Sequence, residues 1–139
     1  MTGSVEETYA AAIQHDLYDG DGTVVGVVRK PPGWFNALVD ENVAVLGPPE
    51  PLLDETKQRH EELKLAGMCD EGAHNAAWEE VDFERRYRAF LDSDADAQAA
   101  LDGLIDRLHD GEDIALVCFE GENKRCHRRV LRERLLDRL

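Results

Sequence analysis

The chain has 139 residues and a formal net charge of −14, from 30 acidic and 16 basic side chains. This length fits one domain, which buries roughly 70% of its unfolded surface on folding. So much acid excludes a protein that binds nucleic acid or an anionic membrane over its whole surface. The excess of Asp and Glu is spread over nearly every segment. We interpret it as the surface of a halophile's protein, since high salt screens charge repulsion at short range.

The sequence also limits the cellular setting. No apolar run reaches the ~18 residues of a membrane span, and no basic-then-apolar signal sequence opens the chain. Three cysteines is an odd number, which in a chain without a secretory signal argues against a disulfide framework. We therefore expect a cytoplasmic protein with reduced thiols and no membrane partner.

The first half of the chain predicts one helix and two strands. Ser4-Val-Glu-Glu7 has the spacing of a capping box, and apolar residues then recur at helical intervals up to Leu17. Residues 23–28 are β-branched and almost wholly apolar, which indicates a buried strand that ends before a pair of prolines. Residues 42–46 form a weaker strand candidate.

Helical patterns dominate the next part of the chain. Residues 52–66 predict a surface helix that stops at Gly67, and helices are expected to begin after Asp82 and after Ser93 or Asp94. The segment between Gly67 and Asp82 has no clear period, and Trp78 is its expected anchor in a loop or short helix. His74, Asn75 and Trp78 are possible walls of a pocket, by their polarity and size.

The segment 114–129 carries most of the residues with chemical potential. Ile114-Ala-Leu-Val-Cys-Phe119 predicts a short strand buried on both faces, and a turn-prone Glu120-Gly-Glu-Asn123 follows it. Asn123 is expected to cap a last amphipathic helix, which buries Val130, Leu131, Leu135 and Leu139.

These elements together predict a single α/β domain over residues 1–139. Its small, mostly parallel sheet should be flanked by helices, because helices precede and follow two strongly apolar strands. Ligands of such sheets bind beyond the carboxyl ends of the strands. That rule brings Arg29 and the segment 118–128 to one edge of the sheet.

Cys126 and His127 are the candidate catalytic residues. With Asn123 as the cap, Cys126 is the third helical residue, where the helix dipole and neighbouring cations favour a thiolate. His127 is a natural general acid or base beside it. Two alternatives stay open: Cys126 as a small core residue, and His127 as a buried histidine bonded to a carbonyl.

A metal site is the second possibility for the same residues. Cys118, Cys126 and His127, with His74 or Cys69 from a distant loop, are soft tetrahedral ligands. The chain has no Cys-x2-Cys pair, and a lone cysteine in a strand is more often core. We therefore expect neither a metal nor another cofactor.

The basic residues of the last helix suggest an anion site. Segment 124–138 holds seven of the basic residues and a net charge of +5, so the rest of the chain carries −19. We expect Arg29, Arg125 and Arg128 to bind a small anion such as a phosphate group. Glu120 either belongs to this site, orienting Arg128 or His127, or is only a turn residue. We expect three arginines further along the helix to pair with the acidic surface instead: Arg132, Arg134 and Arg138.

The same segment resembles a known family. Leu116-Val-Cys-Phe-Glu120, followed by Arg125-Cys-His-Arg128, is similar to the signature of the domain of unknown function 488 family. Arg29 with Pro31 and the Phe83-x-x-x-Tyr87 spacing also fit, whereas the family's serine-proline pattern after the first Arg is absent. The resemblance implies the family's fold. It implies no reaction, because the activity of the family is not established.

Two function classes follow from these residues. One is an enzyme on a small anionic substrate, with Arg29, Cys126, His127 and Arg128 converging on one pocket. The other is a binding module for a nucleotide or single-stranded nucleic acid, which the scarcity of aromatic residues near the cluster disfavours. A purely structural role, in which the Cys-His-Arg residues tie the last helix to the first strand, is the third interpretation.

Overall fold

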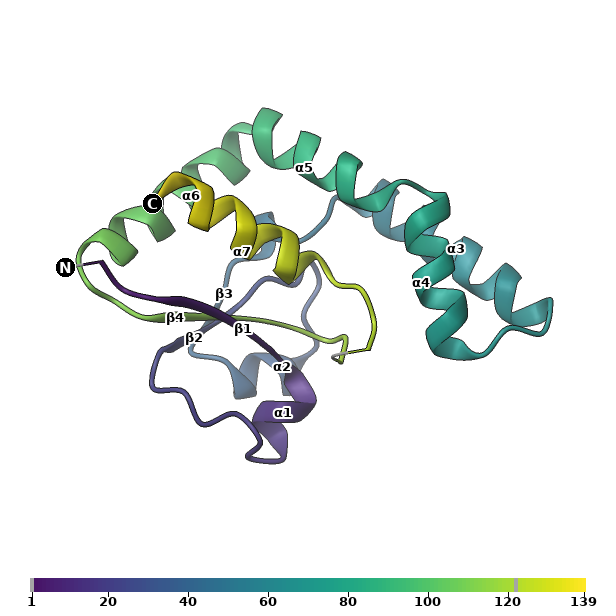
Figure 1. Cartoon of the computed structure of the whole chain (residues 1–139), viewed down its shortest axis with the longest axis horizontal. Helices are drawn as coiled ribbons and strands as arrows, with labels where there is room; N and C mark the ends of the chain where they lie inside the picture. The colour runs from purple at the N-terminus through teal and green to yellow at the C-terminus, as the bar shows by residue number, and fades with distance from the viewer. Residues whose placement is uncertain (1, 122) are drawn as a thin grey trace.

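The computed structural model describes residues 2–121 and 123–139, and a four-stranded parallel sheet lies at its centre (Figure 1). The strands are β1 (Val5–Tyr9), β2 (Thr23–Gly26), β3 (Glu41–Asn42) and β4 (Ile114–Cys118), in the order β1-β4-β2-β3. All five residues of β4 are buried, since β4 pairs with β1 on one side and β2 on the other. The predicted α/β class with a parallel sheet is confirmed.

Helices cover both faces of this sheet (Figure 1). The long ones, α5 (Phe83–Ser93), α6 (Ala95–His109) and α7 (His127–Arg138), lie over one face, and α1 (Ala10–Gln14) and α2 (Gly33–Leu38) lie over the other. Successive strand residues point to opposite faces. Leu116 accordingly packs in the cluster with Leu131 of α7, and Val117 packs with Phe35 of α2. Among the described residues, no helix is long and apolar enough to cross a membrane.

Two further helices stand beside the carboxyl ends of the strands. A short 3-10 helix, η1 (Ala44–Leu46), leads to α3 (Glu50–Leu65), which packs on α4 (Asp70–Glu80). Gly67 ends α3 with a φ of +104°, as predicted, because glycine has no Cβ to oppose a left-handed conformation. The segment whose period was unclear is therefore mainly helical, and Trp78 is buried in it.

The predicted first helix is wrong. Residues 5–9 form β1, and only the five residues of α1 are helical. The capping-box pattern favours a helix locally, but pairing with β4 stabilises a strand at these residues instead. The pairing joins Val5 to Ile114 and Tyr9 to Cys118 along the edge of the sheet. The weak strand candidate 42–46 is likewise mostly η1, and β3 contains only Glu41 and Asn42.

The caps of the helices agree in part with the sequence. Asp94 accepts a hydrogen bond from the Ala97 amide at the start of α6, as predicted. Asp82 precedes α5 as expected but makes no capping hydrogen bond. The prediction for the last helix is wrong by three residues, because its cap is Cys126 and not Asn123. Leu139 is 41% exposed rather than buried.

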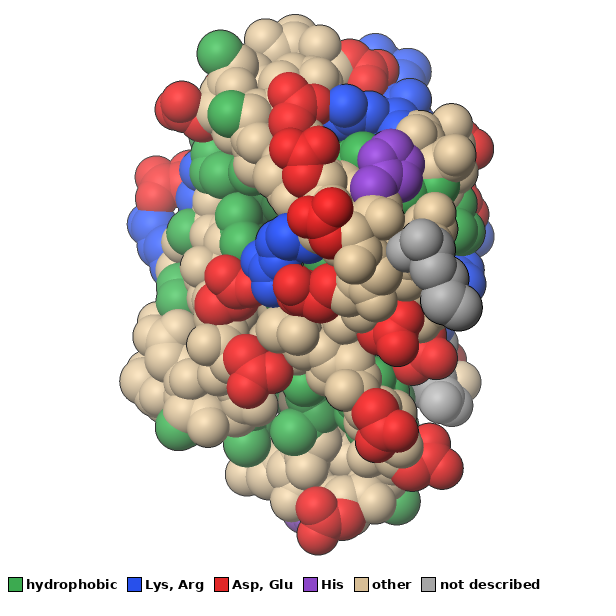
Figure 2. Space-filling model, turned by 90° about the vertical axis from the view of Figure 1, so that its left-hand side faces the viewer, with side chains coloured by type: hydrophobic (Ala, Val, Ile, Leu, Met, Phe, Trp, Pro, Cys, Tyr) green, Lys and Arg blue, Asp and Glu red, His purple; other side chains and the backbone are tan. Residues whose placement is uncertain are grey.

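Acidic side chains spread over the face that lies at the amino ends of the strands (Figure 2). They belong to several elements and not to one tail. This is the opposite edge of the sheet from the one at which ligands are expected.

Candidate functional site

A cavity of about 340 Å³ lies beyond the carboxyl ends of β2 and β4, against α3 and α4. β2 and β4 are direct neighbours, so the expected convergence of their ends on one edge of the sheet is confirmed. Three kinds of side chain in its wall have chemical interest: cations (Arg29, Lys30, Lys57, Arg125), aromatic rings (Trp78, Phe83, Phe119), and sulfur or imidazole groups (Cys118, Cys126, His60, His74, His127).

A disulfide joins Cys118, the last residue of β4, to Cys126, the cap of α7. Both residues line the cavity, although they are only 1% and 4% exposed. The prediction of reduced thiols is therefore wrong for this pair, and among the described residues the free thiol belongs to Cys69. The cysteine count could not reveal the pairing, because it says nothing of how the fold brings a strand end and a helix start together. While the bond is intact, Cys126 has no thiolate with which to react.

His127 is a buried histidine bonded to a carbonyl, one of the two alternatives that the sequence left open. Its Nε2 lies 2.6 Å from the Val27 carbonyl oxygen, which can only accept, so Nε2 carries the ring proton. Its Nδ1 lone pair then faces the Cys126 sulfur at 3.6 Å. Burial lowers the pKa of His127 to about 4, against a smaller raising effect of the bond to Val27. The ring is therefore neutral near pH 7 and can accept a proton at Nδ1.

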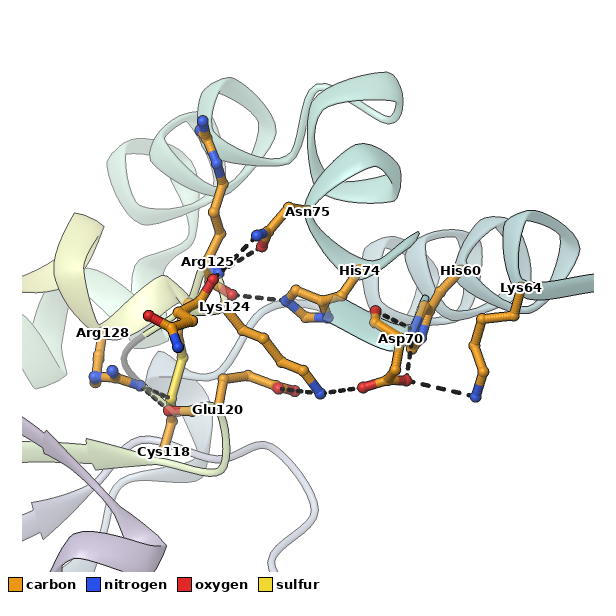
Figure 3. A network of polar contacts seen from close by, with 12 residues as sticks. His60, Lys64, Asp70, His74, Asn75, Cys118, Glu120, Lys124, Arg125 and Arg128 are labelled. Carbon is orange, nitrogen blue, oxygen red and sulfur yellow. Dashed lines mark hydrogen bonds and ion pairs between the residues drawn. A yellow bond between two sulfur atoms is a disulfide. The ribbon is translucent and has the colours of Figure 1, made fainter. Parts of the chain in front are cut away.

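Arg128 lies behind the disulfide and does not line the cavity. Its Nη1 donates to the Cys118 sulfur at 2.9 Å and to the Glu120 carbonyl at 2.6 Å (Figure 3). Its Nε is 3.7 Å from the Glu7 carboxylate and has no hydrogen-bond partner in the part of the chain that the structure describes. Burial lowers the pKa of Arg128. The four-residue convergence expected from the sequence is thus met by Arg29, Cys126 and His127, with Arg128 one layer deeper.

Arg29 follows β2 and enters the cavity wall. Its Nε donates to the Pro48 carbonyl at 3.1 Å, and its Nη2 donates to the Gly47 carbonyl at 2.7 Å. The guanidinium also lies over the ring of Phe90, 5.5 Å from the centroid. These contacts fix the orientation of the group, and among residues 2–121 and 123–139 no carboxylate is in hydrogen-bond contact with it.

Helix α4 holds the connection between β4 and α7 in place (Figure 3). His74 donates through Nε2 to the Arg125 carbonyl at 2.8 Å. Asn75 accepts from the Arg125 amide at 2.9 Å and donates to the Asn123 carbonyl at 3.0 Å. Side chains of α4 thereby hold backbone groups of the connection, although the bonded residues are 48 to 51 positions apart in the chain.

The charged residues of the connection are partly paired. Lys124 lies 2.5 Å from Asp70 and 3.8 Å from the Glu120 carboxylate. The bond to Lys124 lowers the pKa of Asp70 to about 2. Arg125 lines the cavity and contacts Glu79 at 2.6 Å, with half of its side chain exposed. Glu120 therefore orients Arg128 through its carbonyl, and its carboxylate faces Lys124 instead.

The outer arginines of α7 behave mostly as a solvated helix face. Arg134 pairs with Asp92 at 3.2 Å, and Arg138 pairs with Asp102 at 2.5 Å. Arg132 donates to a carbonyl of β1 at 2.9 Å. None of these three lines the cavity, which agrees with the structural role expected for them.

Sequence reasoning missed part of the cavity wall. Lys57 and His60 come from α3, where they are three residues apart and so share a helix face. The spacing of Lys57 and His60 could have indicated a shared polar face, but the thin apolar stripe of α3 indicated only a helix exposed to solvent. Phe83 was missed as well: it lines the cavity stacked on Trp78, with ring centroids 3.9 Å apart, whereas Trp78 and His74 were expected as possible pocket walls and do line it. The inference that the cluster has few aromatic neighbours is therefore wrong, because it measured distance along the chain.

Three potential metal ligands meet at the same place. The ligand atoms of Cys118, Cys126 and His127 all lie within 4.8 Å of one another. In the disulfide both sulfurs are already bonded, so this state offers a metal only the imidazole nitrogen. No metal is assigned here.

Comparison with known proteins identifies a family for most of the chain. A family model described as the active DUF488-N3 subclade matches residues 8–139. Comparisons with curated proteins and with solved structures gave no match.

Proposed function

Since the chain belongs to the domain of unknown function 488 family, whose activity is not established, we propose its function from the residues of the cavity. The proposed function is that of an enzyme that acts on a small anionic, nucleotide-like substrate. The observation that carries the proposal is the meeting of cations, aromatic rings and the Cys126–His127 pair around one space. The volume of about 340 Å³ is within the range of small-ligand pockets, about 300–1,000 Å³.

Arg29 is the proposed anchor of the anion. Its hydrogen bonds to the Gly47 and Pro48 carbonyls align the guanidinium without neutralising it. A planar guanidinium held in this way suits the paired oxygens of a phosphate or carboxylate. Arg125 and Lys57 add positive charge from other parts of the wall. Glu120 can accept a hydrogen bond from a hydroxyl or amino group of the same substrate.

The aromatic residues favour a substrate that also has a flat, apolar part. Trp78, Phe83 and Phe119 lie in the wall of the same cavity as the cations. A base ring can pack on such side chains, and stacking of a base on an aromatic ring contributes about 1–3 kcal/mol. A nucleotide-like molecule combines this ring with an anionic group, whereas inorganic phosphate would use only the cations.

Cys126 is the proposed nucleophile, and His127 is its proposed base. Once the disulfide is reduced, the Cys126 thiol faces the Nδ1 lone pair of a neutral imidazole. Its place at the start of α7 favours the thiolate further, because the helix dipole is positive there. Arg128 acts as a positioning residue behind the pair, through the Glu120 carbonyl.

A binding module without catalysis is the second candidate, and one observation favours it. Trp34 and Phe119 are 54% and 40% exposed, with ring centroids 5.7 Å apart. Exposed rings at the edge of a cavity are typical of sites for single-stranded nucleic acid. The net charge of −14 opposes such a partner, because backbone phosphates bind to basic surfaces. We therefore rank it below the small-molecule enzyme.

Calorimetric titration of the reduced protein tests the proposal. The ligands are a nucleoside monophosphate, the matching nucleoside and inorganic phosphate, all at one salt concentration. We expect the monophosphate to bind best, and Arg29→Gln to weaken it at least about tenfold, the scale of one charge-assisted hydrogen bond. Arg59→Gln is the matched control, since Arg59 pairs with Glu80 and does not line the cavity. No binding of any nucleoside monophosphate, or equal effects of the two variants, would remove the proposal.

A further inference from the structure

The two ends of the Cys118–Cys126 disulfide have different chemical surroundings. Cys118 accepts a hydrogen bond from the buried guanidinium of Arg128, at 2.9 Å from Nη1 (Figure 3). Cys126 faces the unprotonated Nδ1 of His127 at 3.6 Å. Both sulfur-bearing residues line the cavity, so a small thiol that enters it can reach the bond.

Arg128 is better matched to a Cys118 thiolate than to a disulfide sulfur. It is 1% exposed, and the nearest carboxylate, that of Glu7, is 3.7 Å from its Nε. That Nε has no hydrogen-bond partner among the described residues. A buried charge is costly when its counter-charge is not in hydrogen-bond contact, and a negative sulfur at the existing 2.9 Å contact would be closer to Arg128 than the Glu7 carboxylate is.

His127 supplies the matching proton acceptor at the other sulfur. Because its Nε2 donates to Val27, its Nδ1 can take a proton from a thiol at Cys126 or from a thiol that approaches it. The surroundings thus prepare Cys118 to leave as a thiolate and Cys126 to be the sulfur that is attacked.

We propose that Cys118 and Cys126 are a reversible dithiol–disulfide couple, in which Arg128 holds Cys118 as the leaving-group thiolate. The inference goes beyond the proposed substrate site, because the couple requires no bound anion. It assigns Cys118, which the sequence suggested as a core residue, a redox role of its own.

Reduction by a low-molecular-weight thiol, RSH, takes two steps. The thiolate RS⁻ attacks the Cys126 sulfur, the S–S bond breaks, and its electron pair stays on Cys118, beside Arg128. A second RS⁻ then attacks the R sulfur of the mixed disulfide, which releases RSSR and the Cys126 thiolate, and His127 accepts or returns the proton. In sum, the protein disulfide and two RSH give the protein dithiol and RSSR. In the oxidised form the Cys126 sulfur is bonded to Cys118 and cannot act as a nucleophile, whereas in the reduced form it is a free thiol.

Equilibration in glutathione buffers at pH 8, followed by alkylation and mass spectrometry, measures the couple. Cys69→Ser removes the exposed third thiol and serves as the background. We expect a reversible transition, and we expect Arg128→Gln to lower the reduced-to-oxidised ratio at a given buffer about tenfold, because a charge-assisted bond to the thiolate is lost. Arg132→Gln, four residues along the same helix and bonded to a β1 carbonyl, should leave the ratio unchanged.

A second measurement covers the case in which Arg128→Gln fails to fold. In a Cys69→Ser, Cys126→Ser background, the ultraviolet absorbance of the thiolate reports the pKa of Cys118 alone. A pKa below the ordinary value of about 8.5 agrees with the assigned role. A value at or above it, the absence of any disulfide in oxidising buffer, or an Arg128→Gln ratio equal to the control overturns the inference. Neither measurement contains a nucleotide, so its failure is distinct from a failure of nucleotide binding.

Discussion

Lowering the pH from about 6.5 towards 4 should destabilise the folded protein through His127. Over most of this range, protonation of carboxylates should change the stability little. The pKa of His127 is about 4 in the folded protein, because burial opposes the imidazolium. In the unfolded chain it returns to about 6.5. Between these values the unfolded state binds more protons, so the stability contributed by neutral His127 is fully present above pH 6.5 and is lost as pH falls towards 4.

The size of this effect follows from the shift. A lowering of about 2.5 units at about 1.36 kcal/mol per unit gives a loss of about 3 kcal/mol between pH 6.5 and pH 4. Carboxylates lose their contribution lower down. For Asp70, with a pKa of about 2, the loss begins near the ordinary value of about 4. Carboxylates with a lowered pKa begin to lose their contribution near pH 5, so the two ranges overlap only between about pH 5 and pH 4.

Urea unfolding of the oxidised protein at several pH values between 7 and 4, followed through the fluorescence of buried Trp78, measures the effect. His127→Gln keeps a donor for the Val27 carbonyl but cannot take up a proton. It should lower stability at pH 7 and flatten the slope between pH 6.5 and 4. His109→Gln, at the exposed end of α6, is the control and should keep the slope. If wild type and His127→Gln differed by a constant free energy across this range, the argument from burial would be refuted.

Three other predictions concern the fold. The melting temperature should rise in multimolar KCl, since the chain outside segment 124–138 carries −19 and salt screens that repulsion; an unchanged or lower value contradicts this. Tyr87→Phe should cost about 1–3 kcal/mol in urea unfolding, because the Leu46 carbonyl loses a buried donor, and a neutral result would mean that water replaces it. Asp94→Ala should cost about 1 kcal/mol through the lost cap on the Ala97 amide, and Asp96→Ala, two residues further on in the first turn of α6, is its control.

The features that could be predicted from the sequence are those that depend on the local pattern of residues. The buried strand predicted at residues 114–119 forms over Ile114–Cys118, because its side chains are apolar, whereas Phe119 lies just after it and is 40% exposed. Gly67 and Asp94 marked helix ends through backbone chemistry. The rule that ligands bind at the carboxyl ends of parallel strands also predicts that Arg29 and Cys126 lie near each other, and both line the cavity. These inferences need only neighbours along the chain and one rule of topology.

What escaped the sequence depends on contacts between distant segments. The local sequence of β1 predicts a helix, because the strand is stabilised by pairing with β4, and Val5 is 109 residues away from its partner Ile114. The disulfide needs the strand end and the helix start to meet, and Arg128 turns inward because Cys118 and the Glu120 carbonyl lie there. Residue types alone could suggest that these groups react, but not which of them faces the cavity.

The proposed function requires an anionic, nucleotide-like substrate to bind against Cys126. Protection from alkylation tests it most directly: the reduced protein is labelled briefly with and without a nucleoside monophosphate, and mass spectrometry follows each cysteine. We predict that the nucleotide slows the labelling of Cys126 in a concentration-dependent way and leaves exposed Cys69 unaffected, and that Arg29→Gln shifts the protection to higher concentration. Binding of the nucleotide with no change in the labelling of Cys126 would contradict the account.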